Sequence, residues 1–329
     1  MINKLNFQRN ILLSRYTSFR IGGPAKYFFV AESSSQLKEA IKFAYKNNLK
    51  FFVLGGGSNL LVSDKGFDGL VIKIQNSKSK IQNEPKQIVS QLYGAGNSRF
   101  KIIYTDAGVK LNDLVKFSAH NGLTGLEWAT GIPGTVGGAI YGNAGAFSHS
   151  ISELVKDVKV IDLGSRKELI YKNRDCRFVY RGSIFKKDRN LIIISANLKF
   201  KKAKKGYIKR LMEKYLSQKR KNQPLEFYSA GCIFKNFFID NDFKKIKGIK
   251  EVERFKKCGF IPSAYLIEKC GLKGAKVGGA MISKKHSNFI INLGNAKAKD
   301  VIALINLIKK EVMKKFNIKL EEEIEYLGF

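Results

Sequence analysis

Two glycine-rich segments are the parts of this sequence best suited to binding chemistry. The first, GGGSN from Gly55 to Asn59, follows a short apolar run, and the second, GIPGTVGGA, extends from Gly131 to Ala139. Glycine adopts backbone conformations that other residues avoid, so successive amide N–H groups can converge on an anion. The lack of side chains also lets a flat ligand lie against the backbone. Two such loops suit a ligand that has a pyrophosphate and a planar ring.

Other common cofactor and metal motifs are missing from the sequence. Neither loop matches GxGxxG, and no Gly-Lys pair occurs, which excludes the Rossmann and P-loop fingerprints. The four cysteines, at positions 176, 232, 258 and 270, form no CxxC pair, and there are only three histidines, so we expect no metal site. Scattered thiols of this kind are typical of a reducing compartment.

Several longer strings, found in order along the chain, resemble the MurB family of UDP-N-acetylenolpyruvoylglucosamine reductases. They are YTSFRIGGPA (16–25), LGGGSNLLVSD (54–64), GLEWATGIPGTVGGAIYGNAGAF (125–147), CRFVYRGSIFK (176–186), SAGCIFKN (229–236) and LIEKCGLKGAKVGGAMISKKHSNFIIN (266–292). The resemblance runs from about Tyr16 to Gly328. Chance does not readily produce so many separate motifs in one order.

The resemblance implies an α+β fold with a two-part FAD-binding domain of the vanillyl-alcohol-oxidase (PCMH) type and a C-terminal α+β substrate domain. We expect residues 1–75 to form the first FAD-binding subdomain, 76–203 the second, and 204–329 the substrate-binding domain. The implied reaction reduces UDP-N-acetylglucosamine enolpyruvate to UDP-N-acetylmuramate in peptidoglycan precursor synthesis. In the family NADPH reduces FAD, and the flavin passes hydride to the enolpyruvyl methylene carbon.

The resemblance implies three catalytic residues, Arg181, Cys232 and Glu323. Hydride addition leaves negative charge on the neighbouring carbon and its carboxylate, which requires a stabilising group and a proton donor. The planar, permanently charged guanidinium of Arg181 suits that charge. Glu323 is expected to assist stabilisation or protonation of the intermediate, and Cys232 to deliver the proton. Without the motifs, Arg181 and Glu323 would be interpreted as ordinary surface charges.

Cys232 departs from the family's pattern, which usually has serine in Gly-Ser-x-Phe-Lys/Arg-Asn-Pro, whereas this chain has GCIFKNF. A thiol, with an unperturbed pKa of about 8.5, gives up a proton more readily than a hydroxyl, so the replacement is chemically competent. The alternative is a buried, inert thiol. Phe237 stands in place of the usual proline, which bears on the turn that follows Asn236.

The resemblance places the cofactor and the substrate on separate sets of residues. Those expected to contact FAD are Gly55, Gly56, Gly57, Ser58, Asn59, Leu60, Gly131, Ile132, Pro133, Thr135, Gly137, Gly138 and Ala139. Those expected to contact the substrate's diphosphate and uridine are Lys219, Asn236 and His286. Arg220 and Lys221 are alternatives to Lys219, and His286 could instead have a structural role. The short stretch between Arg181 and Cys232 resembles the type II subgroup, and Glu325 stands where an arginine is usual.

Helices and strands must bring these dispersed residues together. Apolar residues at helical spacing predict helices over 36–48, 112–121, 206–221, 264–270 and 299–316. Short apolar or alternating runs predict strands over 51–54, 70–74, 88–93, 101–105, 154–163, 168–171, 191–200, 288–292 and 318–327. Segment 125–147 is too rich in Gly and Ala for an ordinary helix or strand.

Charge and hydropathy limit the partners that we expect. The net charge is +33, but the lysines are spread along the chain without a recognition motif, which favours a solvated lysine-rich surface over nucleic-acid binding. The apolar runs are far shorter than the ~20 residues of a spanning helix. We therefore expect a cytoplasmic monomer with no nucleic-acid or membrane partner. Two alternatives to the reductase stay open, a flavin oxidase on the same fold and a nucleic-acid-binding protein.

Overall fold

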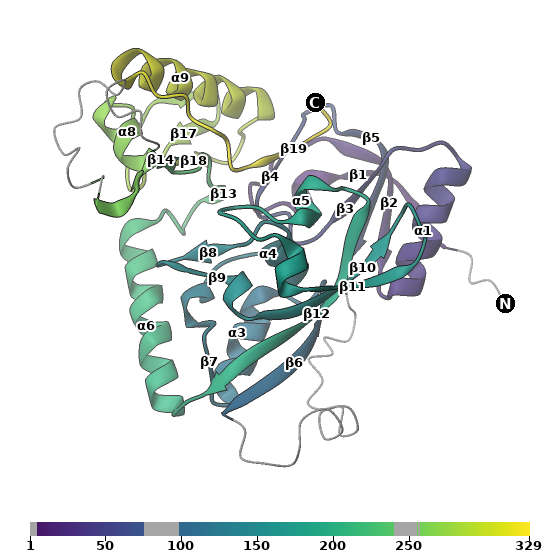
Figure 1. The fold of residues 1–329 in the computed structure, drawn as a ribbon. Coiled ribbons are helices and arrows are strands. Elements are labelled where there is room, and N and C mark those ends of the chain that lie inside the picture. The colour runs from purple at the N-terminus through teal and green to yellow at the C-terminus, as the bar shows by residue number, and fades with distance from the viewer. Residues whose placement is uncertain (1–4, 76–98, 240–254, 256) are drawn as a thin grey trace. The chain divides into compact units, whose positions relative to one another are not determined.

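The computed structural model describes residues 5–75, 99–239, 255 and 257–329 of the chain (Figure 1). Its helices are α1 (Ser34–Lys46), α3 (Leu111–His120), α4 (Val136–Tyr141), α5 (Ile184–Lys187), α6 (Lys205–Asn222), α8 (Ser263–Lys269) and α9 (Ala298–Phe316). Its strands are β1 (Gln8–Leu12), β2 (Pro24–Ala31), β3 (Phe51–Leu54), β4 (Leu60–Val62), β5 (Phe67–Ile74), β6 (Phe100–Asp106), β7 (Leu123–Thr124), β8 (Gly145–Ala146), β9 (His149–Ser150), β10 (Val155–Asp162), β11 (Glu168–Lys172), β12 (Leu191–Lys202), β13 (Tyr228–Cys232), β14 (Phe237–Phe238), β15 (Phe260–Ile261), β16 (Lys276–Val277), β17 (Ala280–Ile282), β18 (Phe289–Asn292) and β19 (Glu325–Leu327). The predicted α+β class is confirmed.

The chain divides by its internal contacts into two compact units. Unit 1 comprises Met1–Gln8, Tyr27–Gly56 and Gly69–Gln218, and unit 2 comprises Arg9–Lys26, Gly57–Asp68 and Lys219–Phe329. The first glycine loop is therefore shared, because Gly55 and Gly56 belong to unit 1 and the residues from Gly57 onward to unit 2. The three predicted domains, 1–75, 76–203 and 204–329, stay a prediction.

Unit 1 is built around an antiparallel sheet of strand order β11-β10-β12-β6. Alternation along the long strand β12 explains its place: Leu198 and Phe200 are fully buried, whereas Lys199 and Lys201 are exposed. The buried faces join α3 and α4 in one apolar cluster that includes Trp128, which is 1% exposed. This cluster supports the second glycine loop, which leads directly into α4.

A second cluster in unit 1 supports the approach to the first glycine loop. Ser33 is the N-cap of helix α1, and its hydroxyl accepts a hydrogen bond from the Gln36 N–H at 3.2 Å. Its apolar face, with Leu37 and Ile41, packs in a cluster with residues of β5. Strand β3 pairs in parallel with β5, and its last residue, Leu54, delivers the chain into the loop.

Unit 2 contains the antiparallel sheet β13-β18-β17-β16, which packs against α9. Its core also includes Phe19, Ile21 and Leu61 from the two N-terminal segments. The Asp64 carboxylate accepts from the Ala298 N–H at 2.8 Å at the start of α9. An anion at that position is favourable because the first amides of a helix lack intrahelical acceptors. The N-terminal segments are thus part of the C-terminal core.

Most predicted elements agree with the structure to within a few residues, but two predictions were wrong. The tail is a strand only in β19, which pairs in parallel with β4, and not from residue 318 onward. Segment 125–147 does contain a helix, the short α4. The predicted strand at 88–93 lies outside the described residues. No helix in the described ranges is long and apolar enough to cross a membrane.

Candidate active site

The two glycine-rich loops contact one another in unit 1. A Cβ built on Gly55 would lie 2.7 Å from Oγ1 of Thr135, and one on Gly56 would lie 2.5 Å from the Cα of Gly134. Real Cβ atoms do not approach backbone atoms so closely. Packing of one loop on the other therefore requires glycine at position 56, whereas at position 55 the close neighbour is a side-chain hydroxyl.

Both loops keep some backbone hydrogen-bond donors available. In the second loop, the N–H groups of Gly137 and Gly138 donate to the Ala107 carbonyl at 2.9 Å and to Oγ1 of Thr135 at 3.3 Å. The N–H groups of the first two glycines of the first loop make no hydrogen bond with any other described residue. The N–H groups of Gly134 and Thr135 in the second loop make none either, so each loop retains amide donors that an anionic group could satisfy.

Lys73 is a residue of this region that the sequence analysis missed. Its ammonium group donates to the carbonyl of Gly55 at 3.2 Å. Burial, and then the charge of Lys110, holds the pKa of Lys73 below its ordinary value. The two lysines together make this region positive, which would attract an anionic group. The available signal was a lysine near the end of the otherwise apolar run from Leu70 to Ile74.

Arg181 lies at the tip of a tight hairpin in unit 1. Val179 and Gly182 exchange both backbone hydrogen bonds, at 3.0 and 3.1 Å, and Arg181 has a left-handed φ of 54°. That conformation is uncommon for arginine and needs support from its surroundings. The Asn143 amide donates to the Val179 carbonyl at 2.9 Å, which ties the hairpin to the segment after α4. A Cβ on Gly145 would lie 3.3 Å from Nη1 of Arg181, so the guanidinium lies close to that backbone.

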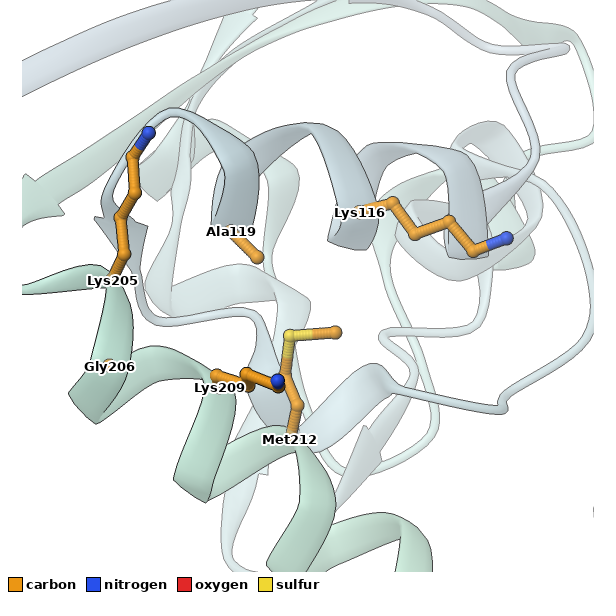
Figure 2. A pocket seen from close by; sticks show the side chains of 6 residues that line it. All are labelled: Lys116, Ala119, Lys205, Gly206, Lys209 and Met212. Atoms are coloured by element: carbon orange, nitrogen blue, oxygen red, sulfur yellow. The ribbon is translucent and has the colours of Figure 1, made fainter.

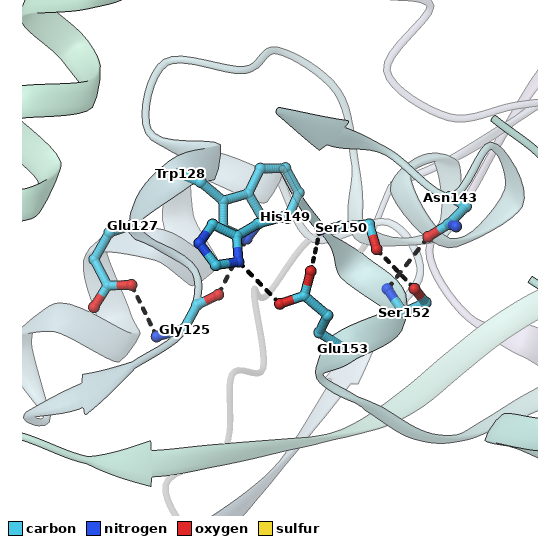
Figure 3. A network of polar contacts seen from close by, with 8 residues as sticks. All are labelled: Gly125, Glu127, Trp128, Asn143, His149, Ser150, Ser152 and Glu153. Atoms are coloured by element: carbon cyan, nitrogen blue, oxygen red, sulfur yellow. Dashed lines mark hydrogen bonds and ion pairs between the residues drawn. The ribbon is translucent and has the colours of Figure 1, made fainter. Parts of the chain in front are cut away.

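Polar contacts fix the segment that carries Asn143 (Figure 3). Its side-chain oxygen accepts from the Ser152 N–H at 3.3 Å. Ser150 and Glu153 form a capping box, in which the Ser150 N–H donates to the glutamate at 2.8 Å. The same carboxylate lies 3.0 Å from Nδ1 of His149. The support of the Arg181 hairpin is therefore itself held by a satisfied network.

In unit 2 the backbone of Glu323 is held from two sides. Its N–H donates to the Ile233 carbonyl at 2.8 Å, and its carbonyl accepts from the Asn59 side-chain amide at 3.0 Å. Ile233 directly follows Cys232, and Asn59 ends the first glycine loop. One unit thus gathers the predicted proton donor, the predicted glutamate and a predicted cofactor contact, although Asn59 and Glu323 are 264 positions apart.

His286 lies in the turn that enters β18. Its ring meets the Phe289 ring edge-on, with centroids 4.9 Å apart, and Phe289 is the cross-strand partner of Cys232. Burial, and then the charge of Lys273, lowers the pKa of the imidazole. Its Nδ1 is buried and has no side-chain or main-chain partner at full hydrogen-bond geometry among the described residues. Ligand contact and a structural role both stay predictions for this histidine.

The other predicted substrate contacts, Lys219 and Asn236, also belong to unit 2. The Asn236 side-chain oxygen accepts from the N–H of Ser263 at 3.4 Å. Lys219 is 3% exposed, while Arg220 and Lys221 are exposed. Burial lowers the pKa of Lys219 to about 8. Of the three basic alternatives, only Lys219 is therefore held in an environment that would strengthen its attraction for an anion.

A separate cavity of about 380 Å³ lies between α3 and α6 of unit 1 (Figure 2). It has a largely apolar lining with three lysines around it, and the lining residues are Lys116, Ala119, Lys205, Gly206, Lys209 and Met212. None of the residues predicted to bind cofactor or substrate lines it. The cavity is therefore distinct from the predicted site.

Comparison with known proteins decides the family. The family model named "UDP-N-acetylenolpyruvoylglucosamine reductase, C-terminal domain" matches residues 223–327, and the "FAD binding domain" model matches residues 25–165. The reductase of Solibacter usitatus is 37% identical over 316 residues, which cover 96% of this chain and 95% of that protein. The chain belongs to the UDP-N-acetylenolpyruvoylglucosamine reductase family. The prediction from the motifs is confirmed.

Further relatives match the sequence or the structure of this reductase over nearly its whole length. The reductase of Clostridium novyi is 34% identical over 328 residues, which cover 100% of this chain and 94% of that protein. The crystal structure of MurB from Thermus caldophilus superposes with a TM-score of 0.75 at 32% identity and covers 98% of this chain and 100% of that one. The protein is thus an FAD-dependent oxidoreductase of peptidoglycan precursor synthesis.

The residues of the reductase fit an FAD molecule. Both glycine-rich loops lie within the matched FAD binding domain, residues 25–165. The first two glycines of the first loop have amide donors with no acceptor among the described residues, and Lys73 and Lys110 place positive charge nearby. A pyrophosphate would accept from these amides, and its negative charge would be attracted by the two lysines. The second loop presents backbone surface that suits a flat ring.

Proposed function

We propose that this reductase converts UDP-N-acetylglucosamine enolpyruvate to UDP-N-acetylmuramate with NADPH as the reductant. When bound, FAD supplies the hydride-transfer chemistry between NADPH and the enolpyruvyl methylene carbon. The protein must then hold the negative charge that develops on the adjacent carbon and its carboxylate, and it must protonate that carbon. We assign these two tasks to Arg181, Glu323 and Cys232.

One observation carries this assignment, the hydrogen bond from the Glu323 N–H to the Ile233 carbonyl at 2.8 Å. It fixes the glutamate beside the strand end that carries Cys232. A carboxyl group and a thiol held on adjacent backbone segments can share the work of stabilising and protonating one intermediate. The thiol gives its proton to the substrate carbon and becomes a thiolate, which regains a proton from solvent before the next turnover.

Arg181 and the substrate-binding residues complete the proposal. The hairpin of Arg181 presents a guanidinium that stays charged at every working pH and can bind a carboxylate through two parallel hydrogen bonds. Lys219, with its pKa lowered by burial, would bind the diphosphate as a cation. Asn236 and the buried Nδ1 of His286 would donate or accept hydrogen bonds to the sugar nucleotide.

The cofactor contacts are proposed on both loops. The backbone of residues 55–60 would bind the pyrophosphate, and that of residues 131–139 would face the planar ring. Both the amide donors of the first loop and the positive charge of Lys73 support the first half of this assignment. We further propose that the protein works in the cytoplasm as a monomer without a membrane partner, and its dispersed lysines support the absence of a nucleic-acid partner.

The test uses the FAD-loaded enzyme and its Cys232→Ala and Cys232→Ser variants. NADPH oxidation is expected to depend on the enolpyruvyl sugar nucleotide, and Cys232→Ala should slow turnover by about 10²–10⁴-fold, the usual contribution of a general acid. Cys232→Ser should restore part of it. Cys270→Ala is the control, since that half-buried thiol lies in α8's C-cap and outside the site. Full turnover of Cys232→Ala would refute the assignment, and oxygen consumption without the sugar nucleotide would favour an oxidase.

A further inference from the structure

The segment that follows Cys232 is not paired with β18, although Cys232 itself is the last paired residue of β13. Strand β13 ends at Cys232 and β18 begins at Phe289. The pairing of the two strands is irregular between Ser229 and Cys232, where Gly231 has a left-handed φ of 80°. Cys232 therefore forms the last residue pair between the two strands and lies next to a bulge. Strand pairing is locally disrupted at a bulge.

Beyond the end of the strand pairing, the side chain of Asn288 binds the backbone of the segment that follows Cys232. Its oxygen accepts from the Phe234 N–H at 2.9 Å, and its amide donates to the Phe234 carbonyl at 2.8 Å. Its backbone carbonyl accepts from the Ile233 N–H at 2.8 Å. A primary amide that binds both groups of one residue replaces a backbone partner. Asn288 is 3% exposed, so water does not compete for these bonds.

Asn288 thereby holds the two residues that follow Cys232, and one of them, Ile233, is hydrogen-bonded to Glu323. The Ile233 N–H is bound by Asn288 on one side, and the Ile233 carbonyl is bound by Glu323 on the other. Asn59 then holds the carbonyl of Glu323. A continuous hydrogen-bonded path leads from Asn288 across the thiol-bearing segment to the end of the first glycine loop.

We propose that Asn288 is a positioning residue for the protonation step, holding the segment 232–234 so that the Cys232 thiol keeps its place beside Glu323. This inference rests on the proposed role of Cys232. It requires no contact between Asn288 and the substrate. The side chain acts through its two hydrogen bonds to Phe234 alone, while the backbone carbonyl of Asn288 binds the Ile233 N–H.

The chain offers a matched control at the other end of β18. Asn292 is 4% exposed, and its amide donates to the Phe19 carbonyl at 3.0 Å. Its side-chain oxygen accepts from the N–H groups of Gly294 at 2.8 Å and Ala296 at 3.1 Å. Asn292→Ala therefore also removes a buried, hydrogen-bonded asparagine from unit 2. It leaves the segment after Cys232 intact.

The experiment measures the two half-reactions of the FAD-loaded enzyme separately by rapid mixing. Asn288→Ala is expected to slow flavin oxidation by the enolpyruvyl sugar nucleotide by about tenfold or more, a part of the factor that a general acid contributes. Flavin reduction by NADPH and the KM for the sugar nucleotide should change less than about twofold, since neither uses the proton donor. Asn292→Ala should leave both half-reactions within about threefold. A similar slowing in both asparagine variants would overturn the proposal.

A double variant separates this inference from the role of Cys232. If Asn288 acts only through the thiol, Asn288→Ala will slow flavin oxidation no further in a Cys232→Ala background. A further tenfold loss there would show that Asn288 acts by another route and would overturn the proposal. Full turnover of the Cys232→Ala variant would instead contradict the proposed function itself. Should Asn288→Ala fail to fold, Asn288→Asp, which keeps the acceptor for the Phe234 N–H, is assessed by the same criteria with an intermediate slowing expected.

Discussion

Alanine at Gly56 is expected to destabilise the protein without any ligand present. The new Cβ would lie 2.5 Å from the Gly134 Cα, 2.9 Å from its carbonyl carbon and 3.3 Å from the Thr135 nitrogen. All three are backbone atoms, so one loop must move by about 1 Å to reach ordinary contact distances. Overpacking of this kind costs about 1–3 kcal/mol. For a unit of this size that corresponds to a fall of about 2–12 °C in the unfolding temperature.

Gly138→Ala is the control for this prediction. Its nearest neighbour would be Oγ1 of Thr135 at 3.5 Å, an ordinary contact, and Gly138 lies within α4. Alanine there should keep or raise the stability of the FAD-free protein, by up to about 1 kcal/mol. Thermal unfolding of the FAD-free variants followed by circular dichroism makes the comparison, and flavin fluorescence then gives FAD affinity. Equal unfolding temperatures for Gly56→Ala and wild type would refute the loop-packing argument.

Three further predictions follow from the burial and capping of particular residues. Because its pKa is lowered to about 8, Lys219 loses its charge as the pH rises through that value, so the KM for the sugar nucleotide should rise about tenfold between pH 7 and 9 in steady-state assays. In the Lys219→Arg variant the KM should not change with pH over this range. A wild-type KM that is constant over the same range would contradict the assignment of Lys219. Asp64→Ala removes the carboxylate that caps α9 at Ala298 and should cost about 1–2 kcal/mol in denaturant unfolding, whereas Asp64→Asn, which keeps an acceptor, should cost less. Burial raises the pKa of Cys176 to about 12, so mass spectrometry after alkylation at pH 8 should find Cys258 labelled and Cys176 unmodified; equal labelling would show that the thiol is accessible.

Local patterns sufficed to predict the long helices and the regular strands. The helix predicted over 299–316 is α9, Ala298–Phe316, and the strand predicted over 51–54 is β3, Phe51–Leu54. Apolar spacing determines which face of a segment can be buried, and this information is local. The structure of the tail depends on more than local apolar spacing. Residues 318–324 alternate like a strand, but among the described residues they form a single isolated bridge, between Glu322 and Phe234. The continuous pairing, with β4, is confined to the three residues of β19.

The sequence was enough to identify the family and its FAD cofactor and to predict the residues of its site, because motifs such as GGGSN and GCIFKN preserve chemistry in their order and spacing. Only the tertiary structure showed that Gly56 is needed for contact with Gly134, that Asn59 holds Glu323, and that Asn288 supports the segment after Cys232. These contacts join residues far apart along the chain. Their formation depends on which apolar surfaces are buried together and on which buried polar groups must then be satisfied, and neither is encoded in a local pattern.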